Sequence, residues 1–105
     1  MDIDTIKPAI RAYINRLGKQ VHISRTILYG SVVQGSATPS SDIDMLVLSD
    51  DFAKKDPDER SRILYRASVG FPYDLHVYGT TDREFKEASP LSTLGQIQKQ
   101  TLLTL

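Results

Sequence analysis

Two aspartates separated by a single residue, Asp42 and Asp44, lie in the segment Ser-Asp-Ile-Asp-Met-Leu-Val-Leu. This segment predicts a strand, in which side chains two positions apart lie on the same face. Two neighbouring carboxylates repel each other unless a cation lies between them, and carboxylate oxygens are ligands that Mg²⁺ prefers. The pair therefore indicates a divalent-metal site, although an isolated Asp-x-Asp is more often a turn or a solvated strand end.

A second group of residues is suited to binding phosphate. Gly30 and Ser31 directly follow the apolar segment Ile-Leu-Tyr, which predicts another strand. Glycine lets the backbone approach a phosphate, serine adds a hydroxyl and an amide, and a helix beginning there would present free amides to an anion. Asp74, on a third predicted strand, would add a carboxylate to the same face. Carboxylates beside a phosphate site suit two-metal phosphoryl transfer, in which ions about 3.5–4 Å apart stabilise the attacking and leaving oxygens.

Helical and strand periodicities divide the chain into elements that would position these residues. They predict a helix over residues 3–17, strands over 21–29, 42–48 and 73–78, a turn or short helix over 31–35, a polar loop over 36–41, and helices beginning at 56–57, near 83 and at 89–90. Residues 101–105 either extend the last helix or leave it. This order predicts an α/β (α+β) fold with helices flanking a small mixed sheet. At 105 residues, the chain is expected to be a single domain, residues 1–105.

Polar residues and prolines mark the expected helix ends. Asp2 or Asp4 is suited to cap the first helix, in which Pro8 is expected only near the first turn. The Asp-Pro pair at 56–57 and the Ser-Pro pair at 89–90 each combine a capping residue with a proline at the first helical position. The tyrosines are expected to pack against the core with their hydroxyls in water.

Composition argues against several classes of function. The 13 basic residues balance the 13 acidic ones, so the chain has no general attraction for nucleic acid or for an anionic membrane. The absence of cysteine excludes disulfides, thiol nucleophiles and cysteine-ligated metals. No segment is apolar over the length of a membrane span, and the acidic N-terminus does not resemble a secretory signal. We therefore expect a soluble, cytoplasmic protein.

The order and spacing of these residues carry a family resemblance. The segment from Leu28 to Val47 contains, in order, the end of a hydrophobic strand, Gly-Ser, a short helix, a Ser/Thr/Pro loop and Ser-Asp-x-Asp with an apolar tail, and Asp74 follows in a later strand. This pattern resembles the signature of polymerase-β-type nucleotidyltransferases, and more narrowly that of the minimal nucleotidyltransferase (MNT) group. The resemblance extends over residues 29–78 and implies the nucleotidyltransferase fold.

The resemblance also implies a role for each of the five motif residues. Asp42, Asp44 and Asp74 would be the catalytic carboxylates and would hold two Mg²⁺ ions, with Asp74 helping to activate the attacking hydroxyl. Gly30 and Ser31 would hold the β- and γ-phosphates of a nucleoside triphosphate, with ATP expected. A nucleoside monophosphate would be joined to an acceptor and pyrophosphate released.

Two features differ from, or add to, the family pattern. Many members carry an arginine after Gly-Ser, where this chain has Val32, and neither Val32 nor Gln34 can stabilise phosphate as a guanidinium does. Cations that could compensate are Arg25, Lys54, Arg60, Arg62 and Arg66. His76 is predicted on the face of Asp74, either as an ordinary hydrogen-bonded strand residue or as a helper to the acidic site.

Three functions are compatible with the sequence. MNT domains of this size resemble the antitoxin half of HEPN–MNT toxin–antitoxin pairs, which implies transfer of AMP to a HEPN-type toxin within a hetero-oligomer. Alternatively, the domain neutralises a partner by occlusion alone, as the missing arginine suggests. Aminoglycoside nucleotidyltransferases share the motif, but they carry further substrate-binding structure that 105 residues scarcely allow.

Overall fold

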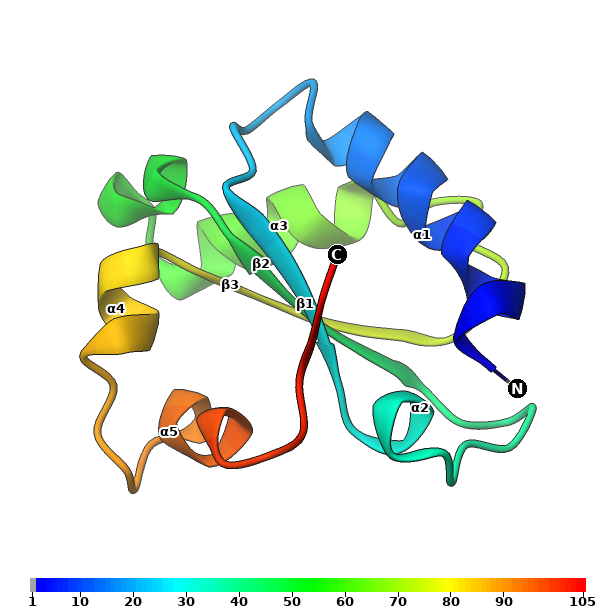
Figure 1. The fold of residues 1–105 in the computed structure, drawn as a ribbon. Helices are drawn as coiled ribbons and strands as arrows, with labels where there is room; N and C mark the ends of the chain where they lie inside the picture. The colour runs from blue at the N-terminus through cyan, green and yellow to red at the C-terminus, as the bar shows by residue number, and fades with distance from the viewer. Residues whose placement is uncertain (1) are drawn as a thin grey trace.

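The computed structural model describes residues 2–105 as a sheet flanked by helices (Figure 1). Its elements are, in order, α1 (Ile3–Leu17), β1 (Arg25–Tyr29), α2 (Ser31–Gln34), β2 (Ile43–Leu48), a 3₁₀ helix η1 (Asp50–Lys54), α3 (Pro57–Arg66), β3 (Leu75–Thr80), α4 (Asp82–Lys86), α5 (Thr93–Gln98) and β4 (Leu103–Thr104). Within the described residues, no helix is long and apolar enough to cross a membrane.

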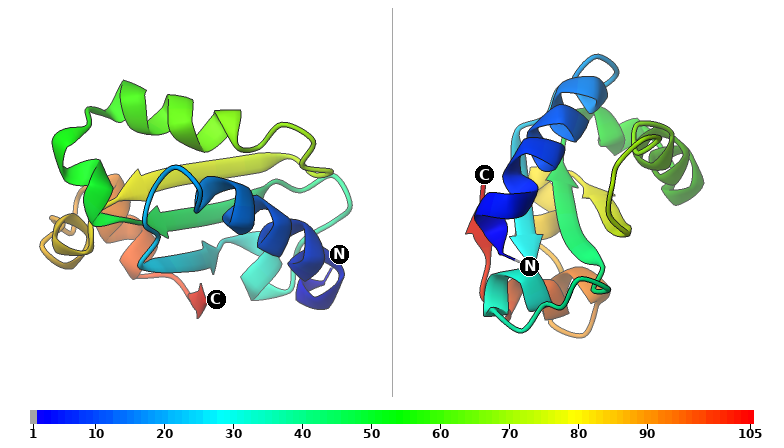
Figure 2. Two further views of the ribbon diagram at one scale, coloured as in Figure 1. Left: turned by 90° about the horizontal axis from the view of Figure 1, so that it is seen from above. Right: turned by 90° about the vertical axis from the view of Figure 1, so that its right-hand side faces the viewer.

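The four strands form one mixed sheet in the order β3-β2-β1-β4 (Figure 2). β2 and β3 are parallel, and β1 is antiparallel to both β2 and β4. A parallel pair needs a crossover connection, and η1 with α3 provides it. The expected small mixed sheet flanked by helices is confirmed.

Each face of the sheet has its own apolar cluster. Helices α1 and α3 cover one face, where Ile10 and Leu64 belong to the same cluster as Met45. On the other face, Phe85 of α4 and Ile97 of α5 belong to the same cluster as Leu46. Figure 1 shows α1 and α3 above the sheet, whereas α5 lies below it. The two-residue period of β2 divides its side chains between the clusters, so that the face of Asp44 is the face of α4 and α5.

The first helix begins as expected but contains its proline deeper than predicted. Asp2 caps α1 by accepting a hydrogen bond from the Thr5 amide at 2.9 Å. Pro8 lies in the second turn, where its missing N–H leaves the carbonyl of Asp4 without a helical donor. Because Asp4 is exposed, water can satisfy that carbonyl, and the helix continues to Leu17.

Hydrogen bonds join α1 to α3 on their shared face of the sheet. The Tyr13 hydroxyl donates to the carbonyl of Leu64 at 2.7 Å, and the Arg16 guanidinium donates to the carbonyl of Ala67 at 2.9 Å. Tyr13 is fully buried, so the expectation that its hydroxyl lies in water is wrong. Burial raises the pKa of Tyr13 well above its usual value, which keeps the phenol protonated as a donor.

Arg60 of α3 connects its own helix with η1, β3 and α4. Its guanidinium binds both oxygens of Glu84, at 2.8 and 3.2 Å, and donates to the carbonyls of Phe52 at 2.6 Å and Lys55 at 3.0 Å. It also donates to the carbonyl of Gly79 on β3 at 3.4 Å. Arg60 is therefore a structural residue.

The outer edge of β3 is partly occupied by side chains of α3. The amide of Ile43 bonds the carbonyl of Asp74, and the amide of Ser49 bonds that of Thr80, so even-numbered residues of β3 face β2. Odd-numbered residues then direct their amides and carbonyls outward. Two of these groups are bound from α3: the Val77 amide donates to the Tyr65 hydroxyl at 3.3 Å, and the Gly79 carbonyl accepts from Arg60.

The C-terminal elements differ most from the sequence-based expectations. α5 is capped by Ser92, which accepts from the Gly95 amide at 3.0 Å, and not by Ser89. Ser89 instead closes a turn, accepting the Ser92 amide and hydroxyl. The end of the chain leaves the helix and forms β4, which pairs with β1. The strands predicted over 21–29 and 73–78 are observed over 25–29 and 75–80.

Candidate functional site

The residues of the expected site lie at one end of the sheet. Gly30 and Ser31 follow β1, Asp42 immediately precedes β2, Asp44 is its second residue, and Asp74 immediately precedes β3. Because β1 is antiparallel to β2 while β3 is parallel to it, the end of β1 and the starts of β2 and β3 meet. Figure 1 shows this end at the right, beside α2, with α4 at the opposite end.

Asp44 lies between Gly30 on one side and His76 on the other. Its Oδ1 is 3.3 Å from Nδ1 of His76, which the register of β2 and β3 places directly opposite. Its Oδ2 faces Gly30 so closely that a methyl group on Gly30 would overlap the carboxylate. The side chain of Asp44 is 25% exposed and that of His76 is 64% exposed. The two carboxylate oxygens of Asp44 thus point toward different strands.

Asp42 and Asp74 occupy equivalent positions one residue before their strands. The pairing Ile43–Leu75, continued by one residue, places Asp42 opposite Asp74, and the 2.8 Å hydrogen bond from the Ile43 amide to the Asp74 carbonyl fixes this register. Both aspartates are exposed. By the two-residue period of strands, they share the face of Asp44 and His76.

Gly30 has a backbone conformation that few other residues adopt. Its φ of 76° and ψ of −153° turn the chain from β1 into α2. α2 is a single turn, Ser31–Gln34, and its C-cap is Gly35, whose φ is 79°. The short helix expected after Gly-Ser is confirmed, and the Ser/Thr/Pro loop that follows leads directly to Asp42.

Tyr29 lies beside Asp44 on the neighbouring strand. Only 6% of it is exposed, and its register partner across the sheet is Asp44. Burial, together with the nearby Asp44 carboxylate, raises the pKa of Tyr29 to about 12. The phenol therefore stays neutral and adds no negative charge at this end of the sheet.

The donor set agrees in its chemistry with a magnesium ion. Within residues 2–105, no group of three or more histidine or acidic side chains is arranged to hold a metal. Magnesium in phosphoryl-transfer sites usually takes only one or two carboxylates and completes its shell with phosphate oxygens and water. The exposed Asp42 and the half-buried Asp44 on one strand face fit an ion of this kind, one that is bound jointly by the protein and a nucleotide.

Three of the five cations considered as substitutes for the missing arginine lie away from Gly30. Arg25 begins β1 and binds Asp82 at 3.3 Å, at the end of the strand opposite Gly30. Arg60 and Lys54 are at that same far end, where Arg60 binds Glu84. Arg62 and Arg66 lie together on the exposed side of α3.

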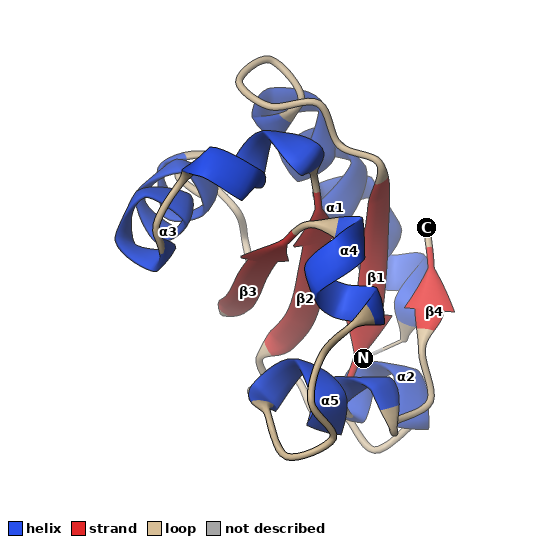
Figure 3. Ribbon diagram, turned by 90° about the vertical axis from the view of Figure 1, so that its left-hand side faces the viewer, coloured by secondary structure: helices blue, strands red, loops and turns tan. Residues whose placement is uncertain are grey.

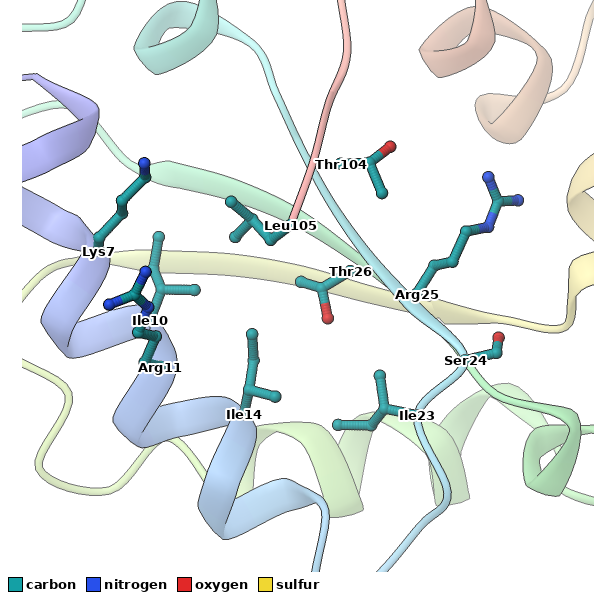
Figure 4. Close-up of a pocket in the computed structure, with 10 residues that line it drawn as sticks. All are labelled: Lys7, Ile10, Arg11, Ile14, Ile23, Ser24, Arg25, Thr26, Thr104 and Leu105. Carbon is teal, nitrogen blue, oxygen red and sulfur yellow. The ribbon is translucent and has the colours of Figure 1, made fainter.

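A groove on the surface is separate from the acidic residues. It has a volume of about 510 Å³ and lies between α1, β1 and the end of the chain (Figure 4). Ile10, Ile14 and Ile23 provide its apolar surface, with Lys7 and Arg11 extending from α1. It is on the α1 side of the sheet, whereas Asp44 faces α4 and α5; Figure 3 shows the latter two helices from their own side.

The contact between Asp44 and His76 was not predictable from spacing alone. The sequence placed His76 on the face of Asp74, and its exposure agrees with that placement. Its position opposite Asp44 depends on the parallel register of β2 and β3, which no local pattern specifies.

Comparisons with known proteins agree with this arrangement. A sequence model of the nucleotidyltransferase domain matches residues 9–101. A candidate nucleotidyltransferase from Sulfolobus solfataricus superposes with a TM-score of 0.66 at 15% identity, over 94% of this chain and 79% of that one. No curated protein is significantly similar to the chain.

Two toxin–antitoxin structures are also similar in fold. A mutant MntA–HpeT toxin–antitoxin gives a TM-score of 0.57 at 24% identity, over 90% of this chain and 70% of that one. A toxin–antitoxin solved with AMP-PNP gives 0.51 at 23% identity, and the match spans 75% of this chain and 60% of that one. At these identities the likenesses establish the fold, and the predicted fold is confirmed.

Proposed function

Because the chain belongs to the nucleotidyltransferase domain family, we propose that it transfers AMP from ATP to a hydroxyl of a partner protein, as the antitoxin of a toxin–antitoxin pair. The observation that supports the proposal is the strand pairing, which brings the chain after β1, with Gly30 and Ser31, and the starts of β2 and β3, with Asp42, Asp44 and Asp74, to one end of the sheet. The reaction would take place in the cytoplasm, where ATP and magnesium are available.

The residues divide the work of the reaction between them. Gly30 and Ser31 bind the β- and γ-phosphates, with the glycine backbone close to Asp44. Asp42 and Asp44 hold magnesium, which neutralises phosphate charge when it is bound. The acceptor oxygen forms a bond to the α-phosphorus, the bond from that phosphorus to the bridging oxygen of pyrophosphate breaks, and Asp74 accepts the proton of the hydroxyl. AMP remains on the acceptor and pyrophosphate leaves.

The choice of a protein acceptor is supported by the structural neighbours of the chain. Two of the similar structures are toxin–antitoxin complexes, and one of these was solved with AMP-PNP. We propose that the partner is a HEPN-type toxin ribonuclease and that the two proteins form a hetero-oligomer.

Labelling with radioactive ATP tests the activity directly. The purified protein is incubated with Mg²⁺, ATP labelled at the α-phosphate and lysate of its source, beside the Asp42→Asn/Asp44→Asn form. We expect a labelled protein band with the native chain and at least a 100-fold weaker band with the double variant, because the metal ligands are lost. Equal labelling by both forms would exclude the proposed site.

A second function, neutralisation of a partner by occlusion, is favoured by one observation. The position directly after Ser31 is not an arginine. Arg25 and Arg60 form ion pairs with Asp82 and Glu84 at the opposite end of the sheet. If the Asp42→Asn/Asp44→Asn form still binds and silences the toxin fully, occlusion is the mechanism. If the variant still binds the toxin but no longer silences it, nucleotidyl transfer is the mechanism of neutralisation.

A further inference from the structure

We propose that His76 is a positioning residue that orients the Asp44 carboxylate toward the phosphate-binding residues. The hydrogen bond from His76 Nδ1 fixes Oδ1 of Asp44, so that Oδ2 remains directed toward Gly30. This inference rests on the proposed function, because it assigns a role to His76 within the same site. It concerns how the metal-binding carboxylate is held, which the family signature does not include.

The strand register makes this contact a consequence of the fold. Asp44 and His76 are direct partners in the parallel pair β2–β3, and both belong to the face on which Asp42 and Asp74 lie. On the opposite side of Asp44, the neighbouring strand β1 is followed directly by Gly30, which has no side chain to compete for Oδ2. One oxygen of the Asp44 carboxylate, Oδ1, therefore contacts His76 of β3, and the other, Oδ2, faces Gly30 after β1.

The chemistry of the two groups determines which atom carries the proton. A carboxylate only accepts hydrogen bonds, so a bond between His76 and Asp44 requires the hydrogen on Nδ1 of the imidazole. In the neutral ring, Nε2 then carries a lone pair. The neutral form of His76 is therefore sufficient for the contact.

Exposure separates a positioning role from simple packing. His76 is 64% exposed, so it contributes little to the apolar clusters, and its contact with Asp44 at 3.3 Å is an open surface interaction. Such a contact adds little to folding stability. Partners that orient a metal ligand nevertheless typically change metal affinity by about 10–100-fold when they are removed.

The test is the affinity of the protein for Mn²⁺, measured by electron paramagnetic resonance in the presence of a non-hydrolysable α,β-methylene ATP. His76→Leu removes the donor, whereas His76→Asn keeps an N–H at the same distance along the side chain. His22→Leu is the matched control, because His22 is the other histidine of the chain and is exposed at the far end of the sheet. Circular dichroism melts establish that each variant is folded.

We expect His76→Leu to weaken Mn²⁺ binding by about 10–100-fold, His76→Asn to recover most of the loss, and His22→Leu to have no effect. If Asp44→Asn weakens Mn²⁺ binding but His76→Leu does not, the positioning role is overturned and the proposed site stands. If His76→Leu and His76→Asn are equally weak, the hydrogen bond is not the cause and the inference also fails. Unchanged binding by Asp44→Asn would overturn the proposed metal site itself.

Discussion

At the scale of single residues, the absence of a side chain at Gly30 decides the geometry of the candidate site. The backbone there has a φ of 76° and a ψ of −153°, and a Cβ would overlap the Asp44 carboxylate. Glycine is therefore required at position 30 for two reasons: the positive φ of its backbone and the closeness of the Asp44 carboxylate. Any side chain would displace either the turn into α2 or the carboxylate.

Replacing Gly30 by alanine is expected to lower nucleotidyl transfer by more than about 100-fold, because a misplaced ligand costs catalysis heavily. The strained backbone should also reduce the free energy of unfolding by about 1–3 kcal/mol. Gly35→Ala is the matched control: its φ is also positive, at 79°, but no atom lies within 4 Å of the added methyl. Urea unfolding and Mn²⁺ binding should show strain in both variants and loss of metal affinity only in Gly30→Ala.

The site residues were predictable from the sequence to the extent that their placement depends on local rules. The two-residue strand period was enough to put Asp42 and Asp44 on one face, and glycine after a strand predicted a turn. The contact of His76 with Asp44 depends on pairing between strands about 30 residues apart in the chain, which is a tertiary property. The roles of these residues stay predictions until the labelling and Mn²⁺ experiments are done.

At the scale of elements, Arg60 connects α3 to η1, β3 and α4. Its side chain is only 13% exposed, and its guanidinium binds three carbonyls together with both oxygens of Glu84. Arg60→Met keeps much of the apolar stem but leaves these carbonyls and Glu84 without their donor. We expect the free energy of unfolding at pH 7 to fall by about 2–4 kcal/mol, measured by urea denaturation.

The dependence of stability on pH provides the control for this effect. The hydrogen bond from Arg60 holds the pKa of Glu84 below its ordinary value of 4.5. Because the folded-state pKa is the lower one, the stabilisation is complete above about pH 4.5 and is lost as the pH falls through the folded-state value. Glu84→Gln should make stability less dependent on pH in this acidic range. An unchanged pH dependence would contradict the role of the pair.

The helix boundaries illustrate which elements local sequence can specify. α1 and α3 begin at the predicted caps, because Asp2 and Asp56 each bond an amide three residues later. The Ser-Pro pair at 89–90 has the same pattern but forms a turn, since Ser92 offers an equivalent cap three residues further on. β4 is two residues long and exists through pairing with β1, so no periodicity could indicate it.

At the scale of the whole molecule, one sheet belongs to two apolar clusters. Alternate residues of β2 contribute to each cluster, so loss of packing on one face is expected to destabilise the packing on the other face. This arrangement supports the prediction that residues 1–105 fold as one domain. A single cooperative transition, reported identically by circular dichroism and tyrosine fluorescence, is the corresponding observable.

Ile97→Ala tests this coupling from the side of α5. Ile97 is 4% exposed in the second cluster, so its truncation should lower the free energy of unfolding by about 2–4 kcal/mol. The midpoint should shift equally for both probes, although all five tyrosines lie outside α4 and α5. Leu91→Ala, at a residue that is 91% exposed, should change stability by less than about 0.5 kcal/mol. Separate transitions would contradict a single domain.

The side chains that α3 places along β3 also limit how copies of the molecule can associate. A continuous fibre built by strand addition needs two available edges on every copy, since each new copy must offer a place for the next. Tyr65 and Arg60 already occupy backbone groups on one edge, and the strand at the other edge has only two residues. Pairing through the short edge would therefore end with two copies, and sheet-to-sheet polymerisation is disfavoured by the native fold itself.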